Sequence, residues 1–312
     1  MNNIAICLLC LLIIPKIVIA DSDLEAVCKD FRADIEPPAS SASPKLPTAY
    51  GKGLLWKIEN PESGTNYLFG TMHSQDSRVS TVSPLVRGAL MQSKVLIMET
   101  IPDQAANQAF LEKMNFNDGQ QLDQLLETAT FAALTKQIHD YGVDNERARF
   151  IKPWAAFSII GRPKPIRAPT LESNLLQIAQ QSKLDVTSLE TMGEILDALD
   201  TLSIEDQLII LIDTICNQEK IIEDTENLIQ LYLNADLAGM VAFNQQTHYD
   251  EAVFNRFMQN ILYDRNIRML ARIQSEFTKG DVFVAVGASH LAGQRGLLNQ
   301  LNQKGYKITL VE

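Results

Sequence analysis

Two histidines follow glycines at the same spacing, near opposite ends of the chain. His73 stands three residues after Gly70 in "LFGTMHSQD", and His290 stands three residues after Gly287 in "FVAVGASH". Each Gly-x-x-His stretch comes directly after an apolar, strand-like run. Imidazole is a common metal ligand and a general acid or base near neutral pH. Two such histidines could therefore hold a metal ion or move a proton.

Glu99 adds a third polar group in a comparable position, because it closes the apolar run "VLIMET" at residues 95–100. A carboxylate beside two imidazoles would form a metal site with open coordination positions. A divalent ion held by His73, Glu99 and His290 would lower the pKa of a bound water and polarise a carbonyl group. Glu99 could instead accept the proton of that water. The alternatives are hydrogen-bonded structural histidines and a Glu99 that faces solvent or pairs with Arg265.

The elements around these residues follow the same order twice. A strand leads into each Gly-x-x-His stretch, and a helix and a second strand follow it. Residues just past the ends of parallel strands line the crevice in which α/β sheets bind ligands. We therefore predict an α/β fold with internally duplicated strand–Gly-x-x-His–helix–strand halves that share a central sheet, and with the Cα atoms of His73 and His290 within about 10 Å. The first half comprises residues 66–70, 84–93 and 95–100, and the second comprises residues 281–287, 296–305 and 306–312.

The two glycines have an expected role of their own. In each stretch the glycine would let the backbone leave its strand in a conformation that a Cβ atom would obstruct. It would also let the backbone approach a ligand closely. Gly70 and Gly287 are therefore expected to shape the turns before the histidines and not to supply a reactive group.

A large helical insertion is predicted between the two halves, at about residues 104–278. One of its helices carries an apolar stripe from Leu122 to Ile138 and stops at Gly142. Such a block could cover a site at the strand ends. Its other expected elements are a strand at residues 185–190, a helix opened by a capping box of Thr191 and Glu194, a helix from Ser203 through residue 224, and a last long helix at residues 250–277.

The N-terminal residues decide the expected compartment. Residues 1–20 contain an apolar stretch before an acidic segment, typical of a cleaved signal peptide, with an uncleaved membrane anchor as the alternative. Residues 21–53 are predicted to form a flexible spacer. The folded domain then covers residues 54–312 and begins with a hairpin of residues 54–58 and 66–70. The protein is expected to be periplasmic or secreted.

Two cysteines, Cys28 and Cys216, remain after removal of such a signal peptide. A disulfide can persist outside the cytoplasm, but the sequence does not set the distance between the two Cα atoms, so a disulfide and two free thiols are both open. The formal net charge of −11 argues against nucleic acid as a partner and against membrane association beyond the signal segment. The sequence leaves the oligomeric state open.

The quoted stretches together resemble the TraB/GumN family, relatives of the Tiki metalloproteases. The resemblance runs from about residue 51 to the C-terminus and is carried by "LFGTMHSQD", "VLIMET", "KPWAAF", "SLET", "YDRNIRML" and "FVAVGASHLAGQRGLLNQLNQKGYKI". It implies an α/β domain in which the two Gly-x-x-His histidines and the intervening glutamate form a metal-dependent hydrolase site. The matching residues here are His73, Glu99 and His290.

Arg265 and Asn266 match an Arg-Asn pair that the resemblance implies for substrate binding or for bracing the site, with a helix salt bridge as the alternative. Ile195 departs from the family pattern, because a glutamine usually stands at this position after "SLET". That departure removes a minor polar contact and leaves the histidines intact.

The resemblance implies a metal-dependent hydrolase, most specifically a peptidase that uses Mn, Co or Zn on a peptide or small acyl substrate. The alternative function is a non-catalytic binding protein for haem or a peptide signal. A serine hydrolase built on Ser289 is disfavoured, because Leu291 stands where a nucleophile elbow needs a glycine. Neither the substrate nor the metal can be named from the sequence.

Overall fold

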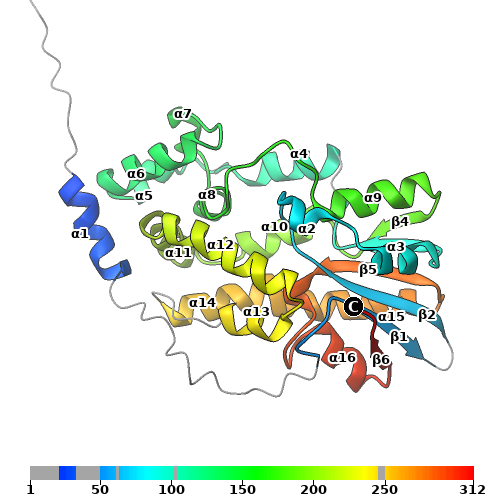
Figure 1. The fold of residues 1–312 in the computed structure, drawn as a ribbon. Helices are drawn as coiled ribbons and strands as arrows, with labels where there is room; N and C mark the ends of the chain where they lie inside the picture. Colours follow the sequence, from blue (N-terminus) through cyan, green and yellow to red (C-terminus); the bar gives the residue numbers. More distant parts are fainter. Residues whose placement is uncertain (1–20, 33–49, 61–62, 102–103, 245–249) are drawn as a thin grey trace, which may run out of the picture.

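A six-stranded sheet lies toward one end of the protein in a computed structural model, beside a block of helices (Figure 1). The predicted signal peptide, residues 1–20, and residues 33–49 of the predicted spacer lie outside the residues that the structure describes. The strand order is β4-β3-β5-β2-β1-β6. The described residues are 21–32, 50–60, 63–101, 104–244 and 250–312. The strands are β1 (Leu55–Asn60), β2 (Ser63–Thr71), β3 (Val95–Met98), β4 (Asp185–Ser188), β5 (Val282–Gly287) and β6 (Lys307–Leu310).

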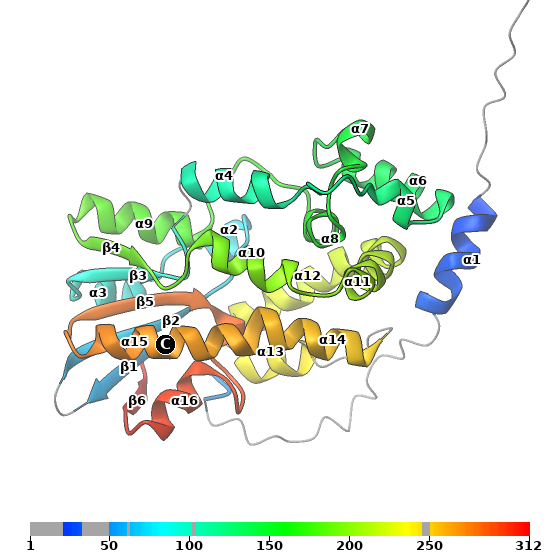
Figure 2. The same ribbon diagram turned by 180° about the vertical axis from the view of Figure 1, so that it is seen from behind.

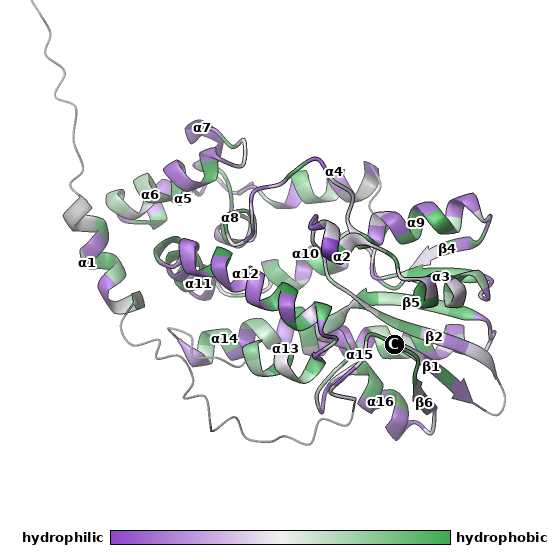
Figure 3. Cartoon of the chain, in the orientation of Figure 1, coloured by the Kyte–Doolittle hydropathy of each residue, from purple (hydrophilic) through white to green (hydrophobic). Residues whose placement is uncertain are grey.

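Burial explains why the central strands form where the sequence predicts them. β5 is buried from Val282 to Val286 and has parallel neighbours on both sides, which favours a continuous apolar run. Figure 3 shows β5 and β2 as hydrophobic strands at the centre of the sheet. The predicted hairpin is confirmed, since β1 pairs antiparallel with β2 and places Leu55 opposite Phe69. β1 also pairs antiparallel with β6, whereas β2, β5, β3 and β4 form a parallel series.

The register brings the C-terminal ends of the parallel strands β2, β5 and β3 to the same end of the sheet. Thr71 at the end of β2 lies opposite Gly287 at the end of β5. Met98 at the end of β3 lies opposite Ala285. The residues that follow these strands therefore leave the sheet on the same side.

Both halves contain the predicted order of strand, helix and strand, but the structure does not establish a duplication. β2 leads through α2 (Ser77–Ser80) and α3 (Pro84–Met91) to β3, which pairs with β5 and β4. β5 leads through a 3-10 turn, η2 (Ala288–His290), and α16 (Leu297–Gln303) to β6, which pairs with β1 at the other edge. The two connections cross the sheet in opposite directions, so the halves occupy different environments. Internal duplication stays a prediction.

The described helices divide between two hydrophobic cores. One core combines the sheet with α2, α3, α9, α12, α13, α15 and α16. The other combines α4 to α8, α10 and α11 around the fully buried Trp154. Because β4, α9 and α15 belong with the sheet, residues 104–278 do not form one separate helical body. The helices not yet given are α4 (Gln104–Lys113), α5 (Leu122–Leu125), α6 (Thr128–His139), α7 (Asn145–Ala148), α8 (Pro153–Ile160), α9 (Leu171–Gln181), α10 (Met192–Asp200), α11 (Ile204–Cys216), α12 (Gln218–Leu233), α13 (Leu237–Asn244), α14 (Glu251–Met258) and α15 (Asp264–Phe277).

Side-chain caps begin several helices at the predicted residues. The side chain of Ser83 accepts a hydrogen bond from the first turn of α3, and that of Ser203 does the same for α11. Thr191 and Glu194 form the predicted capping box of α10. These starts were predictable because each depends on residues within one helical turn.

Two predicted helices are each broken into two. The stripe from Leu122 to Ile138 divides between α5 and α6, because Leu126 is buried in an extended conformation and the next residue caps α6. The helix from Ser203 ends at Cys216, and α12 begins after Asn217. The Asn217 side chain donates to the carbonyl and carboxylate of the preceding turn, which competes with regular helix.

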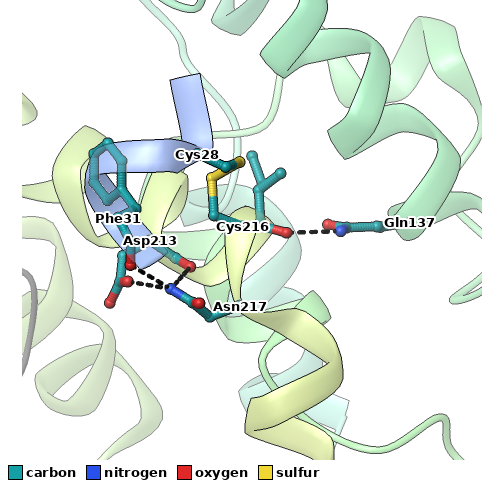
Figure 4. Close-up of a disulfide and its surroundings, with 7 residues drawn as sticks. Cys28, Phe31, Gln137, Asp213, Cys216 and Asn217 are labelled. Atoms are coloured by element: carbon teal, nitrogen blue, oxygen red, sulfur yellow. Dashed lines mark hydrogen bonds between the residues drawn. A yellow bond between two sulfur atoms is a disulfide. The ribbon is translucent and has the colours of Figure 1, made fainter. Parts of the chain in front are cut away.

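Residues Asp21–Arg32 form helix α1, which corrects the prediction of a flexible spacer beginning at residue 21. A disulfide joins Cys28 on α1 to Cys216 at the end of α11, with the Cα atoms 5.3 Å apart (Figure 4). Nδ2 of Asn217 also donates to the carbonyl of Phe31 at 3.2 Å. These contacts hold α1 against the helical core. No helix within the described ranges is long and apolar enough to cross a membrane.

Candidate active site at the strand ends

Glu99 and His290 leave the sheet at neighbouring strand ends. The backbone N–H of Glu99 donates to the carbonyl of Ala285 at 3.0 Å, so Glu99 extends the pairing of β3 with β5. His290 lies in η2, directly after β5. Nε2 of His290 is 3.9 Å from Oε2 of Glu99. The structure therefore brings these two predicted site residues together.

His290 is buried, and Asn266 fixes its orientation. Nδ1 of His290 lies 2.6 Å from Oδ1 of Asn266, and Nδ2 of Asn266 donates to the carbonyl of Arg295 at 2.9 Å. Because Nδ2 is used there, Oδ1 accepts the proton carried by Nδ1 of the ring. Nε2, the nitrogen near Glu99, then has a free lone pair. Burial lowers the pKa of His290 to about 4, so its ring is neutral near pH 7.

Glu99 accepts hydrogen bonds on both of its carboxylate oxygens. Oε2 accepts from the backbone N–H of Gly287 at 3.1 Å, and Oε1 accepts from the guanidinium of Arg265. Burial opposes ionisation of this carboxyl, but His290, Arg265 and the Gly287 amide together hold its pKa below the ordinary value. The Glu99 side chain is 27% exposed. The site therefore presents an ionised carboxylate with some access to solvent.

Arg265 joins Glu99 to a second carboxylate, that of Glu190. Nε and Nη2 of Arg265 donate to Oε2 of Glu190 at 3.0 and 2.8 Å, and Nη2 of Arg268 donates to Oε1 at 3.2 Å. The Glu190 side chain has no exposed surface, and among the described residues these two arginines are its ion-pair partners. Glu190 belongs to the "SLET" stretch but was not among the predicted site residues. Its place just past β4, as Glu99 stands just past β3, is the signal that could have identified it.

Arg265 and Asn266 reach the site from one helix. α14 continues through a π-helical turn, η1 (Gln259–Tyr263), into α15 (Figure 2). Nη1 of Arg265 donates to the carbonyl of Ile261 in that turn at 3.0 Å. Such turns inside helices are frequent at functional sites. Arg265 thus contacts the two carboxylates, while its neighbour Asn266 contacts His290.

His73 has a different partner. Its side chain is 78% exposed, and Nδ1 lies 3.5 Å from Oε2 of Glu172 in the first turn of α9. Glu172 raises the pKa of His73, an effect that the nearby Arg162 guanidinium opposes. Glu172 was not among the predicted site residues, although Thr170 just before it is a typical helix N-cap. Of the described residues, His73 therefore pairs with Glu172 and not with Glu99.

Gly70 is required by close packing and not by its backbone conformation. A Cβ atom on Gly70 would lie 2.7 Å from Cδ1 of Leu291 and 3.2 Å from Ala288. Neither Gly70 nor Gly287 has a positive φ. The obstruction to a Cβ atom at Gly70 therefore comes from packing and not from a left-handed backbone. The close approach is to η2, and Gly287 contributes its N–H to Glu99.

The donor atoms fit a metal ion in part. The described residues contain no group of three or more His, Cys, Asp or Glu side chains gathered around one metal position. Nε2 of His290 and Oε2 of Glu99, 3.9 Å apart, come near the separation of about 3.4 Å adopted by two ligands of a tetrahedral ion. His73 would have to turn from Glu172 to complete the predicted set of three.

Comparison with known proteins gives a family and distant relatives. A model described as the TraB/PrgY/gumN family matches residues 54–310. The chain is similar to Metalloprotease TIKI1 of Xenopus tropicalis, with 23% identity over 336 residues that cover 89% of this chain and 65% of the relative. It is also similar to Metalloprotease TIKI1 of Danio rerio, with 23% identity over 310 residues that cover 82% of this chain and 62% of the relative. The chain thus spans less than two thirds of each relative. No solved structure matches it significantly.

Proposed function

The chain belongs to the TraB/PrgY/gumN family, and from this membership we propose that it is a hydrolase, more narrowly a metal-dependent one that cleaves peptide or small acyl bonds. Support for the metal and for a peptide substrate comes from relatives named metalloproteases, at 23% identity. The polar groups at the strand ends support the location that we propose for the active site.

The fixed pair of His290 and Glu99 carries the proposal. A metal-ligating histidine usually donates its second ring N–H to an oxygen, which fixes the tautomer and aims the free nitrogen at the ion. His290 has this arrangement with Asn266 at 2.6 Å, and its Nε2 lies 3.9 Å from a carboxylate oxygen of Glu99. An imidazole nitrogen and a carboxylate oxygen are suitable donors for Zn, Mn or Co.

We assign His290, Glu99 and His73 as the ligands of a divalent ion. The ion would supply a Lewis acid for the substrate carbonyl and a bound water of lowered pKa. Arg265 holds the Glu99 carboxylate in place through its hydrogen bond to Oε1. Asn266 holds the proton on Nδ1 of His290. Glu99 has a second assignment as the general base that accepts a proton from water.

We propose that the protein acts in the periplasm or outside the cell. The disulfide between Cys28 and Cys216 supports this location, because disulfides persist in oxidising compartments. The predicted signal peptide at residues 1–20, outside the described residues, would direct the chain there.

Metal analysis combined with hydrolysis assays tests the proposal. The purified protein is loaded separately with Mn²⁺, Co²⁺ and Zn²⁺, freed of excess ion, and assayed for bound metal and for hydrolysis of a panel of fluorogenic peptides and esters. We expect a stoichiometric ion in the wild type and its loss, together with hydrolysis, in His290→Ala and Glu99→Gln. His139→Ala is the matched control, because His139 is an exposed histidine at the end of α6 and is not one of the assigned ligands.

Metal binding that survives both substitutions would contradict the ligand assignment. A bound chromophore with a Soret band, together with no hydrolysis of any peptide or ester, would favour the non-catalytic binding protein. Loss of metal in His139→Ala as well would indicate a general loss of structure, which circular dichroism of the variants would detect.

A further inference from the structure

The segment between α8 and α9, residues 161–170, is fixed beside His73 by the side chain of Gln75. Nε2 of Gln75 donates to the carbonyl of Ala168 at 2.8 Å and to that of Ile166, and Oε1 accepts from the N–H of Ile166 at 2.8 Å. Gln75 follows His73 closely in the sequence. The helix after the segment carries the carboxylate that pairs with His73. The segment is therefore a border of the strand-end site.

Two arginines in this segment have no acidic partner among the residues that the structure describes. Arg162 and Arg167 are exposed, and neither belongs to an ion pair there. Lys164, on the same segment, differs because its Nζ lies 2.7 Å from Oδ2 of Asp140. The segment thus carries two available guanidinium groups and one ammonium group that is already paired.

The neighbouring acidic groups contact residues other than these two arginines. Glu172 pairs with His73, while Asp76 and Glu226 both contact Arg78, at 2.6 and 2.8 Å. No ion pair joins any of these three carboxylates to Arg162 or Arg167, so both guanidinium groups stay available to a ligand.

Both arginines lie on the segment that Gln75 holds beside the strand-end site. Arg162 belongs to the segment that leads into α9, and Glu172 in the first turn of α9 pairs with His73. Arg167 stands between Ile166 and Ala168, the two residues that Gln75 holds. A substrate bound at the strand ends would therefore come within reach of these long side chains.

We propose that Arg162 and Arg167 select substrates that carry an acidic side chain or a terminal carboxylate beside the bond to be cleaved, so that the site acts on acidic peptides. This inference rests on the proposed hydrolase function. A guanidinium binds a carboxylate through two parallel hydrogen bonds. Because the chain as a whole repels anions, an acidic substrate needs a local positive segment to approach the site.

Two labelled peptides test the proposal with the full protein. Both have one sequence and a tetramethylrhodamine label, and two Asp residues in the first are Asn in the second. Fluorescence anisotropy measures binding, and chromatography measures cleavage. We expect Arg162→Ala/Arg167→Ala to bind the Asp peptide roughly tenfold more weakly than the wild type, with binding of the Asn peptide unchanged. Added salt should weaken binding of the Asp peptide only.

Lys164→Ala is the matched control. It removes one positive charge from the same segment, but that charge is already paired with Asp140. We expect this variant to keep the wild-type preference for the Asp peptide. All three positions are exposed, so thermal unfolding should be nearly unchanged in every variant.

The outcomes separate this inference from the proposed function. An equal loss for both peptides in the double variant, or the same loss in Lys164→Ala, would overturn the role of the two arginines. Cleavage of both peptides at equal rates would do so too, while leaving the hydrolase standing. Arginine-dependent binding of the Asp peptide, with no cleavage of any peptide or ester, would support the binding role and refute the hydrolase.

Discussion

At the scale of the residue, the site depends on which nitrogen of His290 carries the proton. Oδ1 of Asn266, 2.6 Å from Nδ1, decides this and leaves Nε2 as the free donor. The sequence indicated the histidine, because glycine spacing and a preceding strand are local signals. The pairing with Asn266 across 24 residues follows only from the packing of α15 near β5, which no local pattern specifies.

Asn266→Ala tests that dependence. The substitution leaves the buried Nδ1–H without its acceptor, so we expect affinity for Zn²⁺ to fall about 10–100-fold. The free energy of unfolding should fall by about 1–3 kcal/mol. Isothermal titration calorimetry and urea unfolding measure the two effects. Asn266→Asp keeps an acceptor for Nδ1–H and should bind Zn²⁺ more tightly than Asn266→Ala; equal affinities would separate the asparagine from metal binding.

The two motif glycines should respond differently to a methyl group. In Gly70→Ala the new Cβ would lie 2.7 Å from the fully buried Leu291, and we expect a loss of about 1–3 kcal/mol in the free energy of unfolding. In Gly287→Ala the nearest atoms would lie at 3.5 Å, an ordinary contact, so stability should change little. Urea unfolding of both variants checks this, and equal stabilities would contradict the packing role assigned to Gly70.

At the scale of the element, the strands and helix starts were predictable and two helix breaks were not. β5 depends on a short apolar run, and the start of α3 depends on Ser83 before a proline. Both signals lie within a few residues of the sequence. The break at Leu126 depends on the helical core that buries this side chain. The break at Asn217 coincides with its contact to α1, far away in the sequence. Tertiary packing decided both.

Glu194 connects two elements and makes that connection dependent on pH. Its carboxylate lies 2.6 Å from Nη2 of Arg272 on α15 and accepts from the N–H of Thr191 at 2.9 Å. These contacts, above all the one with Arg272, lower the pKa of Glu194 from the ordinary 4.5 to about 2. Because the folded pKa is the lower one, the stabilisation is complete above about pH 4.5 and is lost as the pH falls toward 2.

Glu194→Gln should therefore lower the free energy of unfolding at pH 7, and its difference from the wild type should shrink as the pH is lowered through 4.5 toward 3. Urea unfolding of both proteins at each pH measures the difference. Glu205→Gln is the control, because Glu205 is exposed and forms no ion pair among the described residues. A difference that stayed constant across this range would show that the carboxylate charge contributes nothing.

At the scale of the whole molecule, the strand-end site stands where the two hydrophobic cores meet. α14 places Phe257 against the helical core, while α15 packs Met269 and Ile273 into the core of the sheet. Arg265 and Asn266 lie at the junction, directly after the π-helical turn (Figure 2). A variant that loosens one core against the other would therefore disturb His290 and Glu99 without touching them.

The disulfide allows stability and site geometry to be separated. It closes a sequence separation of 188 residues and fixes α1 on α6 and α11, away from the strand ends (Figure 1). Reduction should lower the free energy of unfolding by about 2–5 kcal/mol, because the unfolded chain gains conformational freedom. Affinity for Zn²⁺ should not change under conditions where the protein stays folded. Urea unfolding and calorimetry with and without reductant measure both, and Cys28→Ser/Cys216→Ser should not respond to reductant. A parallel loss of Zn²⁺ affinity on reduction would mean that α1 helps to hold the strand-end site.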